Sequence, residues 1–307
     1  MNLHEIECKE NFEVKTLTSF KIGGCVKTAY FPKTQQEFVF LLENLDNFMV
    51  LGNCTNVLFS SSGYNGNIIF TTKMSDYLFN GNFVSAACGV KGQMLSQKAC
   101  ENSLSGFEFM IGFPGTIGGE IYMNASAHGQ SISDKLIRCC LYDKLKKEIV
   151  YKEKFELGFE YRMSCLQKNQ CILLGAEFEL EKGNQEDIKN LMSRNLASRK
   201  NIQPNLVYPN AGSVFKNPPN DSAGRLLEKA GGKLLCGNNV SVWQNHANFI
   251  VNNGNAGSED VLDLMLKMYT AVKEKFTIEL TPEIIFIGNK TEKEEEICQI
   301  LYQKMQK

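Results

Sequence analysis

A glycine-rich stretch, GFPGTIGG at residues 112–119, places the strongest restriction on how this chain folds. Four of its eight residues are glycine, although the residues around it are mostly apolar. Glycine loses more conformational entropy on folding than other residues, so this density predicts either a tight corner between packed segments or a loop pressed against a flat or phosphorylated ligand. The stretch lacks the Gly-Lys-Ser/Thr end of a P-loop and the spacing of a dinucleotide-binding fingerprint. A nucleotide cofactor would therefore need another kind of fold.

The composition excludes several classes of protein. The chain has 307 residues, 43% of them apolar, and a formal net charge of -1, which gives no reason to expect nucleic acid or an anionic membrane as a partner. Its 11 cysteines include no Cys-x-x-Cys pair and are odd in number, so we expect neither a disulfide framework nor a metal site. Because no apolar run could span a bilayer and no signal-peptide pattern follows Met1, we expect the reducing cytoplasm.

Hydrophobic spacing predicts a mixture of helices and strands without internal repeats. Thr34 is expected to cap the first helix, with Glu37 completing a capping box. Ser258 is expected to cap the last long helix. We expect helices near 35–45, 92–103, 186–198, 222–230 and after Ser258, and strands near 48–51, 65–90, 136–151, 170–180, 247–252 and 276–280. The pattern indicates an α+β protein in about three parts.

Six stretches follow one another along the chain in a characteristic order. They are TSFKIGG (18–24), LGNCTNVLF (51–59), GFEFMIGFPGTIGGEIYMNASAHG (106–129), YRMS (161–164), NAGSVFKNP (210–218) and PEIIFIG (282–288). Together they resemble the UDP-N-acetylenolpyruvoylglucosamine reductases, the MurB family of peptidoglycan synthesis. The segment between YRMS and NAGSVFKNP is too short for the extra tyrosine-bearing loop of one subtype, so the chain resembles the shorter, type II form.

The resemblance implies a fold in three parts, an α+β flavoprotein with the FAD-binding fold of the PCMH and vanillyl-alcohol-oxidase type. Residues 1–73, completed by the C-terminal segment 281–307, would form a first FAD-binding subdomain. Residues 74–205 would form a second one, and residues 206–280 the α+β substrate-binding domain. We expect a monomer or weak dimer.

The resemblance also places FAD against two loops. Considered alone, a strand that ends in glycine and small polar residues is more often a simple tight turn than a phosphate site. The first loop, on the FAD diphosphate, would be Gly52, Asn53, Cys54, Thr55, Asn56 and Val57. The second would be Gly112, Pro114, Gly115, Thr116, Gly118 and Gly119, with Asn124 and Ala125.

The chemistry implied by the resemblance has two halves. NADPH reduces the flavin, and hydride then passes to C3 of the enolpyruvyl ether of UDP-N-acetylglucosamine, while C2 must be protonated. Arg162 would bind the substrate carboxylate with its guanidinium fork, and Glu283 would act on the same carboxylate. Ser213 would donate the proton to C2, helped by Lys216 or a bound water. Tyr161, Lys216 and Asn217 would contact the substrate.

Several positions depart from the usual pattern of the family. Glu160 stands where glycine is usual, and Ile285 where arginine is common. Asn53 and Cys54 replace glycines of the first loop, so that Cys54 would face the diphosphate. His128 stands where tyrosine is frequent. None of these changes removes Arg162, Ser213 or Glu283.

Other interpretations compete with this one. Without the resemblance, Ser213 would be a turn serine, Arg162 a surface ion-pair residue and Glu283 an exposed strand residue. A serine hydrolase would need a histidine near Ser213 and a nucleophile elbow, and the sequence offers no elbow and only three histidines. An FAD-dependent oxidase of a small alcohol or hydroxy acid on the same fold is the main alternative. A scaffold protein without activity is the third.

Overall fold

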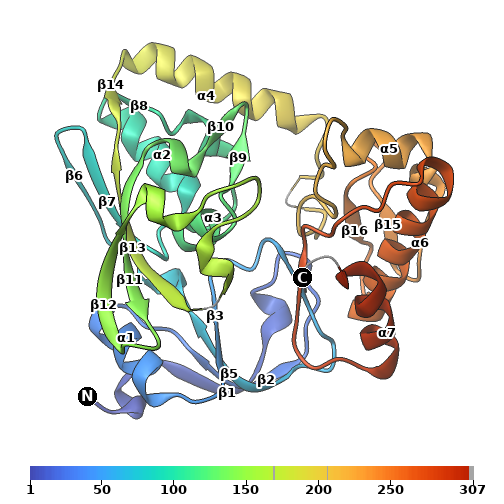
Figure 1. The fold of residues 1–307 in the computed structure, drawn as a ribbon, viewed down its shortest axis with the longest axis horizontal. Helices are drawn as coiled ribbons and strands as arrows, with labels where there is room; N and C mark the ends of the chain where they lie inside the picture. Colours follow the sequence, from blue (N-terminus) through green and yellow to red (C-terminus); the bar gives the residue numbers. More distant parts are fainter. Residues whose placement is uncertain (169, 206, 304–307) are drawn as a thin grey trace. The chain divides into compact units, whose positions relative to one another are not determined.

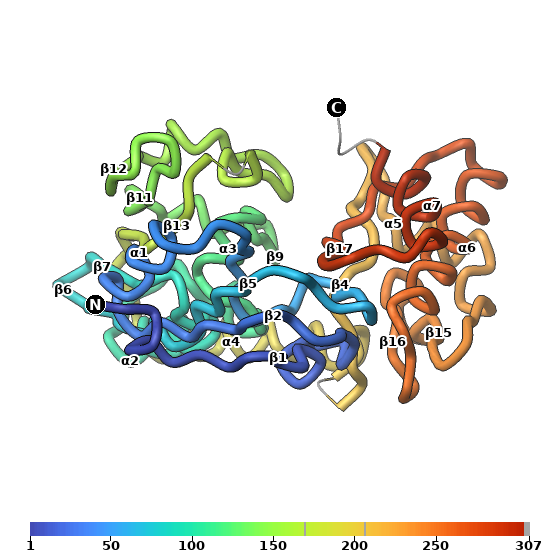
Figure 2. The backbone as a smooth tube through the Cα atoms, turned by 90° about the horizontal axis from the view of Figure 1, so that it is seen from below, coloured from blue at the N-terminus to red at the C-terminus, as the bar shows by residue number. Residues whose placement is uncertain are grey.

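The computed structural model describes residues 1–168, 170–205 and 207–303 (Figures 1 and 2). The chain divides into two compact units, each made of segments that are separated in the sequence. The first unit contains residues 1–9, 28–53 and 67–199. The second contains residues 10–27, 54–66 and 200–307. No helix in the described ranges is both long and apolar enough to cross a membrane.

The first unit contains a five-stranded antiparallel sheet. Its strand order is β12 (Glu148–Glu153), β11 (Leu136–Asp143), β13 (Cys171–Glu179), β7 (Phe83–Ala87) and β6 (Tyr77–Asn80). The helices α2 (Gly92–Glu101) and α3 (Ile117–Tyr122) belong to the same unit, and α3 packs against β7 and β13. In its core, Phe107 and Phe178 meet edge to face with ring centroids 5.2 Å apart. The strands expected near 136–151 and 170–180 are confirmed, the former as a hairpin.

A second sheet has the order β1 (Cys8–Glu13), β2 (Cys25–Tyr30), β5 (Tyr64–Phe70) and β3 (Phe48–Leu51). The expected helix before β3 is α1 (Gln35–Asn44). Thr34 caps it by accepting the Glu37 N–H at 3.1 Å. The predicted capping box is wrong in its second half, because the Glu37 carboxylate accepts the Lys33 N–H at 2.6 Å.

Helix α4 (Gln185–Lys200) presents a different face to the core than its apolar residues predict. Apolar spacing places Ile188, Leu191, Met192 and Leu196 on one face. Ile188 and Met192 are buried, but Leu191 and Leu196 are 38% and 42% exposed. The third buried position is Asn195, whose amide donates to the carbonyl of Glu108 at 3.0 Å. A buried polar group needs such a partner, and this hydrogen bond provides it.

The second unit packs α5 (Ala223–Lys229), α6 (Ser258–Phe276) and α7 (Glu292–Leu301) around one apolar core. An antiparallel pair joins β15 (Val240–Val242) to β16 (Ile250–Asn252), and a parallel pair joins β17 (Ile285–Ile287) to β4 (Val57–Phe59). The strand predicted at 276–280 is wrong. Helix α6 continues to Phe276, because the apolar spacing of Leu264, Met268 and Val272 continues, and it ends at Thr277 with φ +59°.

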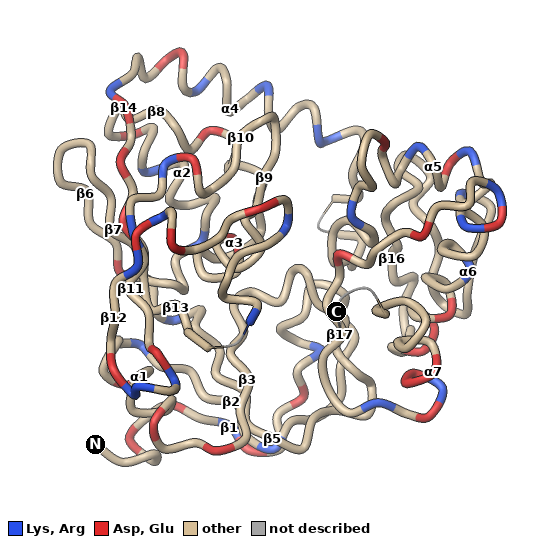
Figure 3. Tube along the Cα trace, in the orientation of Figure 1, with Lys and Arg blue, Asp and Glu red and all other residues tan. Residues whose placement is uncertain are grey.

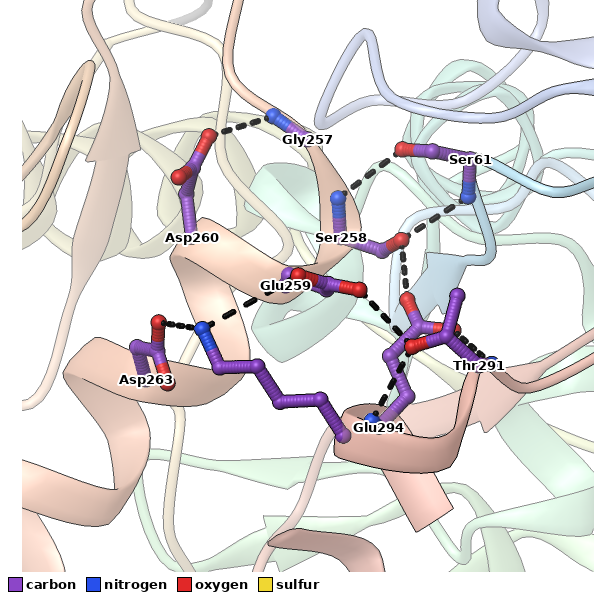
Figure 4. Close-up of polar contacts among 9 residues, drawn as sticks. Ser61, Gly257, Ser258, Glu259, Asp260, Asp263, Thr291 and Glu294 are labelled. Atoms are coloured by element: carbon purple, nitrogen blue, oxygen red, sulfur yellow. Dashed lines mark hydrogen bonds and ion pairs between the residues drawn. The ribbon is translucent and has the colours of Figure 1, made fainter.

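Ser258 is not the N-cap of α6; Gly257 is, and Ser258 is the first helical residue. Its hydroxyl accepts the Ser61 N–H at 2.8 Å and donates to the buried carboxylate of Glu294 (Figure 4). Ser61 in turn accepts the Ser258 N–H at 2.9 Å. Thr291 caps α7 and also donates to Glu259 at 2.7 Å. Hydrogen bonds therefore tie the loop after β4 to the beginnings of α6 and α7.

Candidate functional site

Ser213 lies in an extended segment of the second unit that is held on one side by the chain around Phe249. Ser213 and Phe249 form an antiparallel bridge, and the Val214 N–H donates to the carbonyl of Asn248 at 2.9 Å. The buried side chain of Asn248 also brackets Phe215, accepting its N–H at 3.0 Å and donating to its carbonyl at 2.8 Å. The backbone of Ser213 is thus fixed by neighbours. No feature of the sequence predicted this role of Asn248.

The other side of the same segment is paired with the chain that carries Glu283. The Glu283 N–H donates to the carbonyl of Val214 at 2.8 Å, so Ser213 and Glu283 lie on adjacent segments. Asn56 supports this arrangement, because its amide donates to the Glu283 carbonyl at 3.0 Å and its carbonyl accepts the Ile285 N–H at 3.0 Å. Asn56, predicted as a cofactor residue, therefore also positions a predicted catalytic residue.

Two predicted substrate residues follow on the same segment. Lys216 is half-buried, and its N–H donates to the carbonyl of Thr281 at 2.8 Å. The side-chain oxygen of Asn217 accepts the Ala223 N–H at 3.0 Å, at the beginning of α5. The structure thus brings Ser213, Lys216, Asn217 and Glu283 together in the second unit.

Arg162 belongs to the first unit, at the tip of a short hairpin. Glu160 and Met163 exchange backbone hydrogen bonds of 3.1 and 3.2 Å, so Tyr161 and Arg162 form the turn between them. Arg162 has φ +56°, its guanidinium donates to the Ser126 hydroxyl at 2.7 Å, and it lies over the Tyr161 ring at 5.1 Å. The positive φ falls on Arg162 and not on Glu160, so glycine is not required at Glu160.

Two polar side chains hold this hairpin. The amide of Asn124, a predicted cofactor residue, donates to the Glu160 carbonyl at 3.0 Å. Gln167 donates to the carbonyls of Arg162 at 3.1 Å and Tyr122 at 2.9 Å. No motif marked Gln167, and its role became visible only from these contacts.

Within the first unit, the beginning of the first predicted cofactor loop contacts the second loop. The Asn53 amide donates to the Pro114 carbonyl at 2.7 Å. A Cβ atom added to Gly52 would lie 2.3 Å from the Thr116 hydroxyl oxygen, so a side chain there would force that hydroxyl to move. The segment around Thr116 is held in turn by an antiparallel bridge to Lys91.

Cys54 continues the first loop, in the second unit, with φ +50°. Its carbonyl accepts the Ser19 N–H at 3.2 Å. Burial raises the pKa of the Cys54 thiol to about 12, so the thiol stays neutral at physiological pH. A neutral thiol adds no negative charge to a loop that would hold a diphosphate.

Several buried polar atoms in the first unit have no hydrogen-bond partner among the described residues. They are the hydroxyls of Ser96 and Thr116, both carboxyl oxygens of Glu120 and the side-chain oxygen of Asn124. An unsatisfied buried polar group costs about 1–3 kcal/mol, so each of these atoms would be stabilised by a hydrogen bond to water or to a bound polar molecule. Thr116 and Asn124 were predicted to contact FAD, and their unpartnered atoms fit a cofactor with many polar groups. Glu120 was not predicted. The described part of the chain contains no group of three or more His, Cys, Asp or Glu residues that could hold a metal ion.

Comparison with known proteins shows the family to which the chain belongs. Residues 203–287 match the family model of the UDP-N-acetylenolpyruvoylglucosamine reductase C-terminal domain, and residues 29–145 match an FAD binding domain. Over 289 residues the chain is 42% identical to the UDP-N-acetylenolpyruvoylglucosamine reductase of Caldicellulosiruptor bescii, covering 92% of this chain and 91% of that one. It is 35% identical over 294 residues to the same enzyme of Clostridium novyi, covering 94% and 95%.

A solved structure extends the similarity to the fold. The crystal structure of the UDP-N-acetylenolpyruvylglucosamine reductase MurB from Thermus caldophilus matches with a TM-score of 0.79 and 29% identity, covering 92% of this chain and 98% of that one. Together with the matching FAD binding domain, this likeness confirms the predicted α+β flavoprotein fold with a C-terminal α+β domain.

Proposed function

Because the chain belongs to the family of UDP-N-acetylenolpyruvoylglucosamine reductases, we propose that it reduces the enolpyruvyl group of UDP-N-acetylglucosamine enolpyruvate, giving UDP-N-acetylmuramate for peptidoglycan synthesis. It is an FAD-dependent oxidoreductase that uses NADPH. The observation that carries the proposal is the backbone pairing of the Ser213 segment with the Glu283 segment, in a chain related to the reductases over nearly its whole length.

FAD would be held by residues 52–57 and 112–119 with Asn124 and Ala125. The close approach of Gly52 to Thr116 and the unpartnered oxygens of Thr116 and Asn124 support this placement. Backbone N–H groups of glycine-rich loops suit a diphosphate, since no side chain keeps the anion away. When bound, FAD would supply the hydride carrier between NADPH and the substrate.

The protein's own residues would provide charge stabilisation and a proton. The Arg162 guanidinium offers two parallel donors to the substrate carboxylate, which gains negative charge as hydride reaches C3. Glu283 would act on the same carboxylate, and the hydroxyl of Ser213 would give its proton to C2. The ammonium group of Lys216 would stabilise the alkoxide left on Ser213 until solvent returns the proton. Tyr161, Lys216 and Asn217 would contact the rest of the substrate.

Replacing Ser213 with alanine tests the proposed proton transfer. Reduction of bound FAD by NADPH should stay within about twofold of wild type, whereas re-oxidation by the enolpyruvyl substrate should slow by about 10²–10⁴-fold. Stopped-flow absorbance of the flavin under anaerobic conditions measures both steps. Ser241→Ala, in the same unit, is the control and should change neither. Equal loss in both steps would contradict the role of Ser213, and re-oxidation by oxygen but not by the substrate would favour the alcohol or hydroxy-acid oxidase.

We further propose that the protein acts in the cytoplasm as a monomer or weak dimer. None of the 11 cysteines, all of which lie within the described residues, forms a disulfide, which suits a reducing compartment. The predicted subdomains, 1–73 with 281–307, 74–205 and 206–280, are also part of this proposal. The parallel pairing of β17 with β4 supports the assignment of the C-terminal segment to the first of them. Size-exclusion chromatography with light scattering tests the oligomeric state.

A further inference from the structure

Glu120 is a buried acid for which the mechanism above has no use. It lies on α3, directly after the glycine-rich stretch, and is only 4% exposed. Neither of its carboxyl oxygens has a hydrogen-bond partner among the residues that the structure describes. A carboxyl group in this situation is costly unless something else provides a partner.

The surroundings of Glu120 place its carboxyl group against the second proposed FAD loop. A Cβ atom added to Gly115 would lie 3.2 Å from one carboxyl oxygen. A Cβ atom added to Gly92, the first residue of α2, would lie 2.2 Å from the same oxygen, so the absence of a side chain at Gly92 makes room for the acid. The unpartnered hydroxyl of Thr116 lies one helical turn earlier, and the Glu120 N–H donates to the Thr116 carbonyl at 2.8 Å.

The charge of Glu120 depends on its surroundings. Burial raises the pKa of Glu120 to about 8, so the acid is neutral at pH 7 and can donate a hydrogen bond. Titratable or charged groups on the elements around it include Lys91 before α2, Cys88 after β7, Tyr122 on α3 and Arg199 beside the loop at residue 112. On α2 itself, Lys98 and Glu101 form an exposed pair with each other at 2.7 Å. Burial raises the pKa of Cys88 to about 12 and also raises that of Tyr122, so both stay neutral below pH 9.

We propose that Glu120 binds FAD as a neutral acid, donating its proton to an oxygen of the cofactor at the 112–119 loop, so that ionisation of Glu120 weakens FAD binding. The inference rests on the proposed placement of FAD against this loop. An ionised Glu120 would lose its only proton and would repel the diphosphate in a poorly screened environment. Bound FAD therefore favours the protonated form, and affinity falls as the pH rises through the pKa of the FAD-free protein.

The test titrates FAD into the FAD-free protein between pH 6.5 and 9 and measures the dissociation constant by flavin fluorescence. For the wild type, the constant should be flat up to neutral pH and rise about tenfold by pH 9. Glu120→Gln keeps the size and a donor but cannot ionise, so its constant should change less than about twofold over the same range. Glu101→Gln, an exposed acid of α2, should keep the wild-type rise. A flat wild-type profile, or an equal rise in Glu120→Gln, would overturn the proposal.

A variant of the first FAD loop tests the placement of FAD separately from the role of Glu120. In Gly52→Ala the new Cβ atom would collide with the Thr116 hydroxyl, so FAD binding should weaken about tenfold or more at every pH. If Gly52→Ala weakens binding but Glu120→Gln keeps the pH profile of the wild type, the placement of FAD holds and the role of Glu120 is wrong. If neither variant changes FAD binding at any pH, the placement itself is wrong.

Discussion

At two positions of this protein, the presence of glycine is explained by the side chain that lies opposite it. Gly92 and Glu120 illustrate this, because the space left by a missing side chain is filled by a carboxyl group from another helix. The same relation holds between Gly52 and Thr116. At both places glycine is explained by a close approach and not by an unusual backbone angle, since neither glycine has positive φ.

Gly92→Ala should therefore destabilise the FAD-free protein by about 2 kcal/mol, because overpacking a buried site costs that much. The double variant Gly92→Ala, Glu120→Ala should recover part of this loss, since the clash partner is removed. Urea unfolding followed by circular dichroism measures both. Gly119→Ala, where the nearest atom is 3.8 Å away, is the control. If the free energy of unfolding of the double variant falls by the sum of the losses in the two single variants, the direct clash is contradicted.

At the scale of elements, buried hydrogen bonds decide how helices pack. Asn195 on the buried face of α4 donates to Glu108, and Ser258 joins the beginnings of α6 and α7 through Glu294, so polar groups that need partners hold these helices in place. Apolar spacing predicted that these helices exist, but it could not predict the polar contacts made across the fold.

Ser258→Ala should destabilise the protein by about 1–3 kcal/mol, because the buried Glu294 carboxylate and the Ser61 N–H would lose a partner (Figure 4). Chemical unfolding of the FAD-free protein measures this. Lys293→Ala is the matched control in the same cluster. It removes exposed ion pairs to Asp263 and Glu259, which contribute less than about 1 kcal/mol. Similar losses in the two variants would show that the Ser258 hydrogen bonds add nothing beyond a surface contact.

At the scale of the whole molecule, each unit is assembled from distant parts of the chain. The core of the second unit includes Phe20, Ile22 and Leu58 together with residues beyond 200. Positions of Lys and Arg and of Asp and Glu are scattered over both units (Figure 3), in keeping with the net charge of -1. Folding of the second unit therefore requires contacts between residues that are far apart in sequence.

A fragment of residues 200–307 should consequently fail to fold alone. It lacks the parallel partner of β17, which is β4, and it lacks the apolar side chains of Phe20 and Leu58. Its amide proton NMR spectrum should show narrow dispersion, and its thermal unfolding should lack a cooperative transition, unlike those of the full chain. A cooperative transition in the fragment would contradict the dependence of this unit on residues 10–27 and 54–66.

Local features of the sequence predicted much of the element order and part of the site. The cap at Thr34, the helix at α5 and the strands of the five-stranded sheet follow from short-range spacing and capping. The order of the six motifs identified the family and pointed to Ser213 and Glu283. Predictions were wrong where long-range contacts determine the position of a side chain, as at Ser258 and at the exposed leucines of α4. No local pattern predicted the roles of Asn248, Gln167 and Glu120, because an amide or acid looks the same in the sequence whether its side chain is buried or exposed.

By itself, the sequence determined that the chain is an α+β protein with a glycine-rich stretch at residues 112–119, because propensity, spacing and motif order are properties of neighbouring residues. Only the tertiary structure decided that the Ser213 and Glu283 segments pair, that Asn56 supports them, and that Glu120 is buried beside a loop with no partner. The reason is that burial and hydrogen bonding depend on groups up to hundreds of residues away, as between Asn56 and Glu283. The raised pKa of Glu120 is caused by burial, to which Gly92 of another helix contributes, and no local pattern shows it.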